Sequence, residues 1–299
     1  MQKLLATVAW CALALAGRAQ VNVELAFDQE YFLRGESVPV RVKIGNFSGQ
    51  TVLLGEASDW ITFTVTGTDG RTIRQSASMP AVKPFTIESA KSMAVRADLK
   101  PAFDLSQPGH YKVAVRVMIP ALQREFVTDP EGFDVISGTK VWDKEIGVPG
   151  TTPPEVRRFS LLQATFLKEV RLYARVTDAT ESEVIRVTLL GALPSSSKPE
   201  AAVDQSSQLH ALFQSGQRTF TYFILTPAGE PIIRQTHEIT ATRPRLRAEE
   251  DGRIMVSGGA RVVSLADLPP PPPEALATNV ASTNVVATNA VKAAAVTKK

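Results

Sequence analysis

Cysteine is almost absent from this chain of 299 residues, and its single copy, Cys11, lies among the first twenty. Without Cys11, the mature chain has no thiol for a disulfide, a cysteine-based zinc site or a nucleophilic cysteine. Histidine is scarce too, and none of the three copies, at positions 110, 210 and 237, has a partner at metal-binding spacing. We therefore expect no metal and no cofactor, and a fold stabilised by its cores alone.

Catalytic motifs are also missing. The chain has no Gly-x-Ser-x-Gly elbow, phosphate loop, His-Glu-x-x-His or dinucleotide glycine pattern. Three consecutive acidic residues, 249–251, stand before Gly252, which is typical of a hairpin turn rather than of two carboxyl groups across a cleft. The sequence predicts no catalytic residues and a protein that is not an enzyme.

Charge of one sign is not concentrated anywhere in the chain. The formal net charge is +3, and the excess of cations comes from the two ends, so the part between them is nearly neutral. No run of lysine or arginine is interleaved with aromatic residues. These features argue against nucleic acid as a partner.

The N-terminal residues carry the strongest functional signal. Lys3, the apolar run over 4–15 and the small residues Gly17 and Ala19 predict a secretory signal peptide over 1–19, with a mature chain from Gln20. The run is too short to span a bilayer, and no other segment approaches the roughly 18 apolar residues required. We expect an exported protein, periplasmic or extracellular, with no membrane span.

Residues 20–136 predict an antiparallel β-sandwich. Apolar and polar side chains alternate over 38–44 and over 111–119, the period of half-buried strands. Turn residues separate such runs at 46–50 and at Asp69-Gly70. Asn46-Phe47-Ser48 is also an acceptor sequence for N-glycosylation, although it serves equally as a turn.

Three stretches of this region resemble a known family: FLRGESVPVRVKIGNFSGQTVLL, DWITFTVTGTDGRTI and PAFDLSQPGHYKVAVRVMI. Their order resembles bacterial immunoglobulin-like sandwich domains, most closely the proteinase-inhibitor-type module. The matching positions are structural ones, namely Gly35, Asn46, Gly70, Gly109 and Tyr111. The resemblance covers roughly residues 21–136 and implies the fold, while no inhibitory loop maps onto this chain.

Residues 137–155 have the composition of a linker. Glycine, proline and threonine are frequent there, which predicts a connection stiffened by its prolines. Trp142 and Ile146 inside it indicate that part of the segment packs against one of the domains.

A second antiparallel β domain is predicted over 156–268. Apolar residues alternate with polar ones over 170–176, and apolar residues on both faces of 219–224 indicate a strand buried on both sides. The spacing of Val156, Phe159, Leu162 and Phe166 also fits a short helix, but we favour a strand.

A faint internal repeat links the segment that begins at Leu172 with the one that begins at Leu209. Each is a strand, a polar turn, a strand and a glycine. The run from Asp204 to Phe213 resembles strands of sialidase-type propellers, but a propeller needs at least 4 blades, so we favour two ordinary hairpins in one sheet.

The last segment, 269–299, begins with five prolines and continues with alanine, threonine, asparagine and valine. Thr-Asn recurs at 278, 283 and 288. We expect a polyproline II spacer followed by a disordered tail, because the tail lacks the apolar surface needed to offset its ordering entropy.

Two residues are candidate ligand contacts, Trp60 at the head of a strand and His210 within one. The expected function is non-catalytic binding or scaffolding at the cell envelope or outside the cell, with a protein or glycan partner. One alternative is an inhibitor of exported peptidases, suggested by the family resemblance. Another is a carbohydrate-binding or carbohydrate-active accessory module, suggested by Trp60 and the strand around His210.

Overall fold

The computed structural model describes residues 21–80, 82–153, 155–194 and 198–267. Within them all regular structure is β, apart from 3-10 turns at Pro120–Leu122 and Leu265–Asp267, which confirms the all-β prediction. The predicted signal peptide, residues 1–19, and the proline-led tail, 269–299, lie outside the described residues. No helix in the described part is long and apolar enough to cross a membrane.

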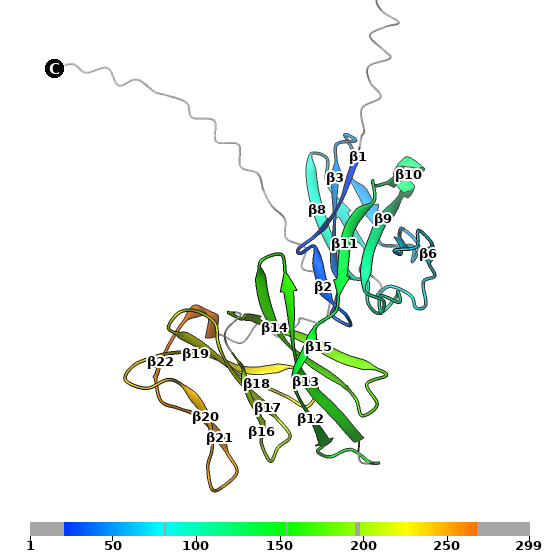
Figure 1. Cartoon of the computed structure of the whole chain (residues 1–299). Helices are drawn as coiled ribbons and strands as arrows, with labels where there is room; N and C mark the ends of the chain where they lie inside the picture. Colours follow the sequence, from blue (N-terminus) through cyan, green and yellow to red (C-terminus); the bar gives the residue numbers. More distant parts are fainter. Residues whose placement is uncertain (1–20, 81, 154, 195–197, 268–299) are drawn as a thin grey trace, which may run out of the picture.

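The N-terminal half is a sandwich of two main sheets (Figure 1). A three-stranded sheet of order β1-β3-β8 faces a six-stranded sheet of order β2-β11-β9-β5-β6, in which β10 also pairs with β9, while β4 and β7 form a separate pair. The strands are β1 (Val21–Phe27), β2 (Tyr31–Leu33), β3 (Pro39–Asn46), β4 (Val52–Leu54), β5 (Ile61–Thr66), β6 (Thr72–Ile73), β7 (Phe85–Ile87), β8 (Lys91–Asp98), β9 (Gly109–Ile119), β10 (Arg124–Val127) and β11 (Glu131–Ile136).

The predicted alternation places the core of this sandwich. Val40, Val42 and Ile44 on β3 are buried, and so are the five alternate residues from Tyr111 to Ile119 on β9. Burial of one face of each strand in this way is the main stabilising contribution, worth about 1.5–3 kcal/mol for each large apolar side chain. The Tyr111 hydroxyl donates to the Gln107 carbonyl at 2.5 Å, which anchors the start of β9.

One side of the N-terminal sandwich is closed by its own chain. After β1 the backbone passes from the three-stranded sheet into the six-stranded sheet, where β2 pairs parallel to β11. Phe32 on β2 is fully buried, with its ring 6.3 Å from Phe27 and 5.6 Å from Phe133. This crossing ties the two sheets together along that side.

The Asn46 side chain fixes the predicted turn after β3. Asn46 is fully buried, and its amide nitrogen donates to the carbonyls of Gln50 and Ile87, each at 2.8 Å. Its amide oxygen accepts from the backbone N–H of Ser48 at 3.0 Å. The segment 46–50 is therefore a turn whose asparagine satisfies buried backbone groups.

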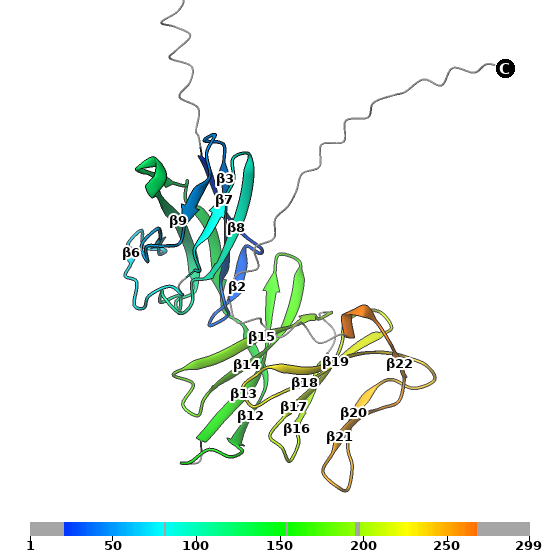
Figure 2. The same cartoon turned by 180° about the vertical axis from the view of Figure 1, so that it is seen from behind.

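The C-terminal half is a second sandwich (Figures 1 and 2). A four-stranded sheet of order β12-β13-β14-β15 packs against a five-stranded sheet of order β16-β17-β18-β19-β22, and the β20–β21 hairpin forms a separate pair. The strands are β12 (Thr139–Val148), β13 (Glu155–Phe166), β14 (Glu169–Asp178), β15 (Val184–Ala192), β16 (Glu200–Val203), β17 (Leu209–Gln214), β18 (Thr219–Leu225), β19 (Pro231–Glu238), β20 (Arg245–Ala248), β21 (Ile254–Ser257) and β22 (Ala260–Val262).

The linker predicted over 137–155 is wrong for most of its length, because residues 139–148 form β12 and pair with β13. The alternation of β12 is broken by a register shift between Lys140 and Trp142 and by the exposed Lys144 between the packed Trp142 and Ile146, and glycines and prolines flank the strand. The expectation that Trp142 and Ile146 pack against a domain is confirmed, since both contact the core of the second sandwich.

Two other expectations for this region are settled by its topology. Residues 155–166 form a strand, as favoured over a helix. The two similar hairpins, β14–β15 and β17–β18, lie in the two facing sheets of one sandwich. Both the propeller and the prediction that they share a sheet are therefore wrong, because each hairpin buries one face in the same core.

The two sandwiches meet through a small apolar cluster. Leu33 of β2 packs with Leu162, Ala164 and Tyr173 of β13 and β14. Burial beside this contact raises the pKa of Glu36 above its ordinary value. The cluster joins the end of the first sandwich to the outer face of the four-stranded sheet.

Candidate binding site at an open sheet edge

A cavity of about 500 Å³ lies on the side of the C-terminal sandwich where β12 and β16 end their sheets. We call it the β16 slot. It is formed by Trp142 and Lys144 of β12, residues 201–205 of β16 and the following turn, and Ala248, Gly252 and Ile254 of the β20–β21 hairpin. Its size is within the usual range for ligand sites in proteins.

The slot lies along the free edge of β16. Successive side chains of a strand point to opposite faces, yet the three consecutive residues Ala201, Ala202 and Val203 all contact this cavity. A cavity can touch all three only from the side of the strand. Among the described strands β16 pairs with β17 alone and ends the five-stranded sheet, so within this part of the chain the outer side of β16 has no backbone partner.

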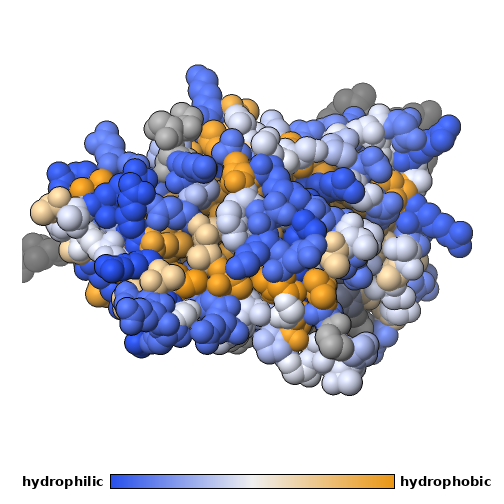
Figure 3. All heavy atoms as spheres, turned by 60° about the horizontal axis from the view of Figure 1, so that its bottom comes forward, coloured by the Kyte–Doolittle hydropathy of each residue, from blue (hydrophilic) through white to orange (hydrophobic). Residues whose placement is uncertain are grey.

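Both walls of the slot are apolar. On one side Trp142 packs with Ala201 and Val203 against the sandwich core. On the other side the cavity meets Ala248 and Ile254 of the hairpin. Figure 3 brings this end of the molecule forward and shows a band of apolar side chains between polar ones.

Charged groups contribute little to the slot. Lys144 and Asp204 are its charged side chains. Both Asp204 oxygens are already engaged, because Oδ1 accepts from the N–H groups of Ser206 and Gln208 at 2.9 and 2.8 Å, and Oδ2 lies 3.2 Å from His210 Nε2. The slot therefore disfavours a cationic occupant, because the Asp204 carboxylate is engaged and Lys144 is itself positive.

A buried hydrogen-bond chain supports the turn at the end of the slot. His210 is buried, with Nδ1 2.6 Å from the Tyr222 hydroxyl and Nε2 beside Asp204. In this arrangement Nε2–H can donate to Asp204 while the Tyr222 hydroxyl donates to Nδ1. Burial, and next the charge of Asp204, raises the pKa of Tyr222 to about 12, so its hydroxyl keeps its proton at neutral pH. Both nitrogens of His210 are in use, which leaves no free base here.

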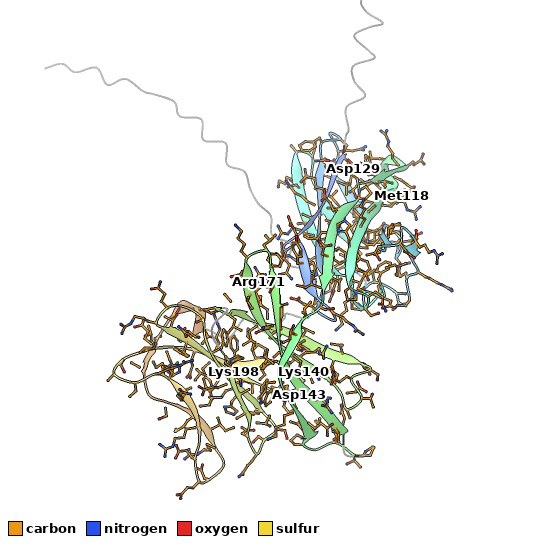
Figure 4. All side chains as sticks on the ribbon, viewed as in Figure 1. Met118, Asp129, Lys140, Asp143, Arg171 and Lys198 are labelled. Atoms are coloured by element: carbon orange, nitrogen blue, oxygen red, sulfur yellow. The ribbon has the colours of Figure 1, made fainter. Side chains whose placement is uncertain are left out.

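The outer face of β12 is polar, in contrast to the slot. Arg158 of β13 forms ion pairs with Asp143 and Glu145 of β12, and Lys140 pairs with Glu181 at 2.6 Å. Lys140 and Asp143 lie close together on this strand (Figure 4). These charges keep that face in water, whereas the slot lies on the side of β12 that carries Trp142 and Lys144.

Neither of the two ligand-contact residues expected from the sequence, Trp60 and His210, lines the slot. Trp60 is only 3% exposed and packs edge-on against Phe85 in the N-terminal core, so it cannot stack on a ligand. His210 lies behind Asp204 rather than in the slot. The sequence did not indicate Ala201–Val203 or Ile254, and only the aromatic Trp142 gave a signal, as a packed residue within the expected linker.

Two further cavities are more polar. One, of about 470 Å³, lies beside β1 and β11 of the N-terminal sandwich and carries Glu30, Glu131 and Asp134. The other, of about 370 Å³, lies where the sandwiches meet, between the half-buried Lys100 and residues 182–184. Burial lowers the pKa of Lys100, whose ammonium lies 3.4 Å from the Val184 carbonyl. In the described ranges no three His, Cys, Asp or Glu side chains converge to hold a metal ion.

Comparisons with known proteins add little to this picture. No protein-family model matches the chain, and no curated protein matches it. Among solved structures, the crystal structure of Spo0M, a sporulation control protein from Bacillus subtilis, is similar with a TM-score of 0.26 and 10% identity, over 53% of this chain and 80% of that one. A similarity at this level carries no functional argument.

Proposed function

We propose that this is an exported, non-catalytic binding protein that holds an extended polypeptide segment in the β16 slot. Export is supported by the signal-like residues 1–19. The observation that carries the binding proposal is the contact of one cavity with three consecutive residues of an edge strand. Addition of a strand to a sheet edge is an established mode of peptide recognition.

The chemistry of the ligand follows from the two walls. A segment paired with β16 would direct alternate side chains towards Trp142 on one side and Ile254 on the other. Backbone hydrogen bonds to β16 would supply affinity, and small or β-branched apolar side chains would fill the walls. A cationic side chain would lose hydration there without gaining a partner, because the slot already carries Lys144.

The non-catalytic part of the proposal rests on the state of the titratable groups beside the slot. Asp204, His210 and Tyr222 all bond to one another or to the backbone. A general base must be free to take a substrate proton, whereas each of these three groups is held by hydrogen bonds within the fold. Their arrangement supports a structural role in holding the β16–β17 turn.

Trp142 provides a direct test. The mature chain contains two tryptophans, of which Trp60 is buried, so slot occupancy can be followed through Trp142. The chain ending at Leu268, which keeps every described strand, is mixed with a capped hexapeptide of alternating threonine and valine. We expect a blue shift and at least a threefold loss of acrylamide quenching.

Matched variants and peptides make this test specific. Ile254→Lys should weaken the hexapeptide at least tenfold, while Met255→Lys, on the exposed face of the same strand, should leave binding unchanged. A capped hexaproline has no backbone N–H groups for pairing and should not bind. Unchanged quenching with millimolar threonine–valine peptide would contradict the proposed function.

A further inference from the structure

We propose that the chain supplies its own occupant, and that residues 285–287 of the C-terminal tail pair with β16 in the same molecule. This inference rests on the function proposed above and names the segment that fills the slot when no partner is bound. The tail thus acts as an internal competitor that an external strand must displace.

The tail starts close enough to reach the slot. The described chain ends at Asp267, which is held on β19 by a hydrogen bond of 3.0 Å from the Thr236 hydroxyl to its carboxylate. β19 lies three positions from β16 in the same sheet, a span of about 14 Å. The five prolines would cover about 15 Å as polyproline II, and the twelve other residues between Asp267 and Val285 add roughly 20 Å.

The composition of the tail matches the slot. No charged residue occurs between Glu274 and Lys292. Val285-Val286 is the one place in that stretch where two β-branched apolar residues are adjacent, so a strand there would direct one valine to each wall. Ala287 follows, and the neighbouring Thr and Asn residues can remain at the rim.

Attachment makes even a weak contact effective. A flexible connection of this length places the segment near the slot at an effective concentration on the order of millimolar. A free peptide with a dissociation constant of a few hundred micromolar would then be mostly bound when attached. The tail need not be a strong ligand to occupy the slot.

Hydrogen exchange of the β16 amides tests this inference in the full mature chain. Exchange is followed for the segment 198–208 in the unaltered protein and in the Val285→Lys/Val286→Lys variant. We expect at least tenfold faster exchange at 201–203 in the variant, because two lysines cannot enter apolar walls. The matched control, Val280→Lys/Val291→Lys, adds the same charge to the tail and should leave exchange within twofold of the unaltered chain.

The outcomes separate this inference from the function on which it rests. Equal exchange in the full chain and the Val285→Lys/Val286→Lys variant would overturn the tail proposal, while binding of the threonine–valine peptide to the chain ending at Leu268 would keep the proposed function. Protection that rises with protein concentration would place the tail of a second molecule in the slot, and would also overturn pairing within one chain. Failure of both tests would remove the slot as a strand-binding site.

Discussion

The two sandwiches of this protein are built alike but differ in how their sides are closed. In the N-terminal sandwich the chain crosses from β1 to β2 and so links the two sheets. In the C-terminal sandwich β12 and β16 end their respective sheets, and no described strand links them on that side. A two-sheet sandwich can therefore have this side either linked or open. The open edge of the second sandwich is a feature of that domain and is not imposed by the sandwich fold.

The side chains beside β1 and β11 are also less suited to binding another strand than those beside β16. The cavity beside β1 and β11 is surrounded by the acidic residues Glu30, Glu131 and Asp134. The slot beside β16 is lined mainly by Ala, Val, Ile and Trp side chains. Charge at an edge discourages the addition of another strand, whereas apolar walls around an unpaired edge favour it.

The largest expected effect on stability comes from weakening the packing of β2, the strand that links the two sheets of the N-terminal sandwich. Phe32→Ala removes a fully buried ring that joins β2 to Phe27 and Phe133, and should lower the free energy of unfolding by about 3–5 kcal/mol. Urea unfolding followed at Trp60 in a Trp142→Phe background measures this loss. Val127→Ala, at an exposed position of β10, is the control and should stay within about 0.5 kcal/mol. Equal effects of the two changes would show that β2 does not hold this side.

A smaller effect is expected from loosening the turn that bounds the β16 slot. Asp204→Asn places an amide N–H against His210 and replaces the charged acceptor of three hydrogen bonds, so about 1–3 kcal/mol of stability should be lost. The threonine–valine peptide should also bind at least threefold more weakly. Asp251→Asn, in an exposed turn, is the control for both measurements. Normal peptide binding by Asp204→Asn would show that the turn does not shape the slot.

The smallest expected effect is a loss of stability at acidic pH. It should arise in the C-terminal sandwich, which contains His237, and not in the N-terminal one. His237 lies on β19 with its Nε2 buried and without a hydrogen-bond partner among the described residues, and burial, then the charge of Arg261, lowers its pKa below 6.5. The unfolded chain therefore binds this proton more tightly, so stability is complete above pH 6.5 and falls as the pH decreases below it. His237→Leu should remove this loss in the C-terminal sandwich and raise its stability by about 1 kcal/mol. His110→Leu, at an exposed position of the first sandwich, is the control. If the His237→Leu variant lost as much stability below pH 6.5 as the unaltered protein, His237 would not be the source of the acid sensitivity.

Strands that bury one face were predictable from the sequence. The alternation in 38–44 and 111–119 is a local property, because each strand must place apolar residues on a single face, and the structure places β3 and β9 there. The sequence of β12 predicts a linker because glycine and proline flank the strand and its alternation is interrupted. A register shift follows Lys140, and the exposed Lys144 stands between Trp142 and Ile146.

The slot could not be predicted in the same way. Its walls come from three segments far apart in the sequence, and the edge strand itself contains Ala201-Ala202, which have little strand preference. Trp60 and His210 were chosen as residue types that often touch ligands. Their burial depends on tertiary packing, against Phe85 for one and between Asp204 and Tyr222 for the other.

The buried amide of Asn46 bears on how the protein can be produced. Its nitrogen, the atom to which an oligosaccharide would be attached, already donates to two carbonyls inside the fold. In a eukaryotic secretory pathway the sequence Asn46-Phe47-Ser48 would be accessible only before the turn forms, and a glycan added then would prevent it from closing. Expression in a host that glycosylates should thus give a mixture in which the modified fraction fails to mature, whereas a bacterial periplasm avoids that competition.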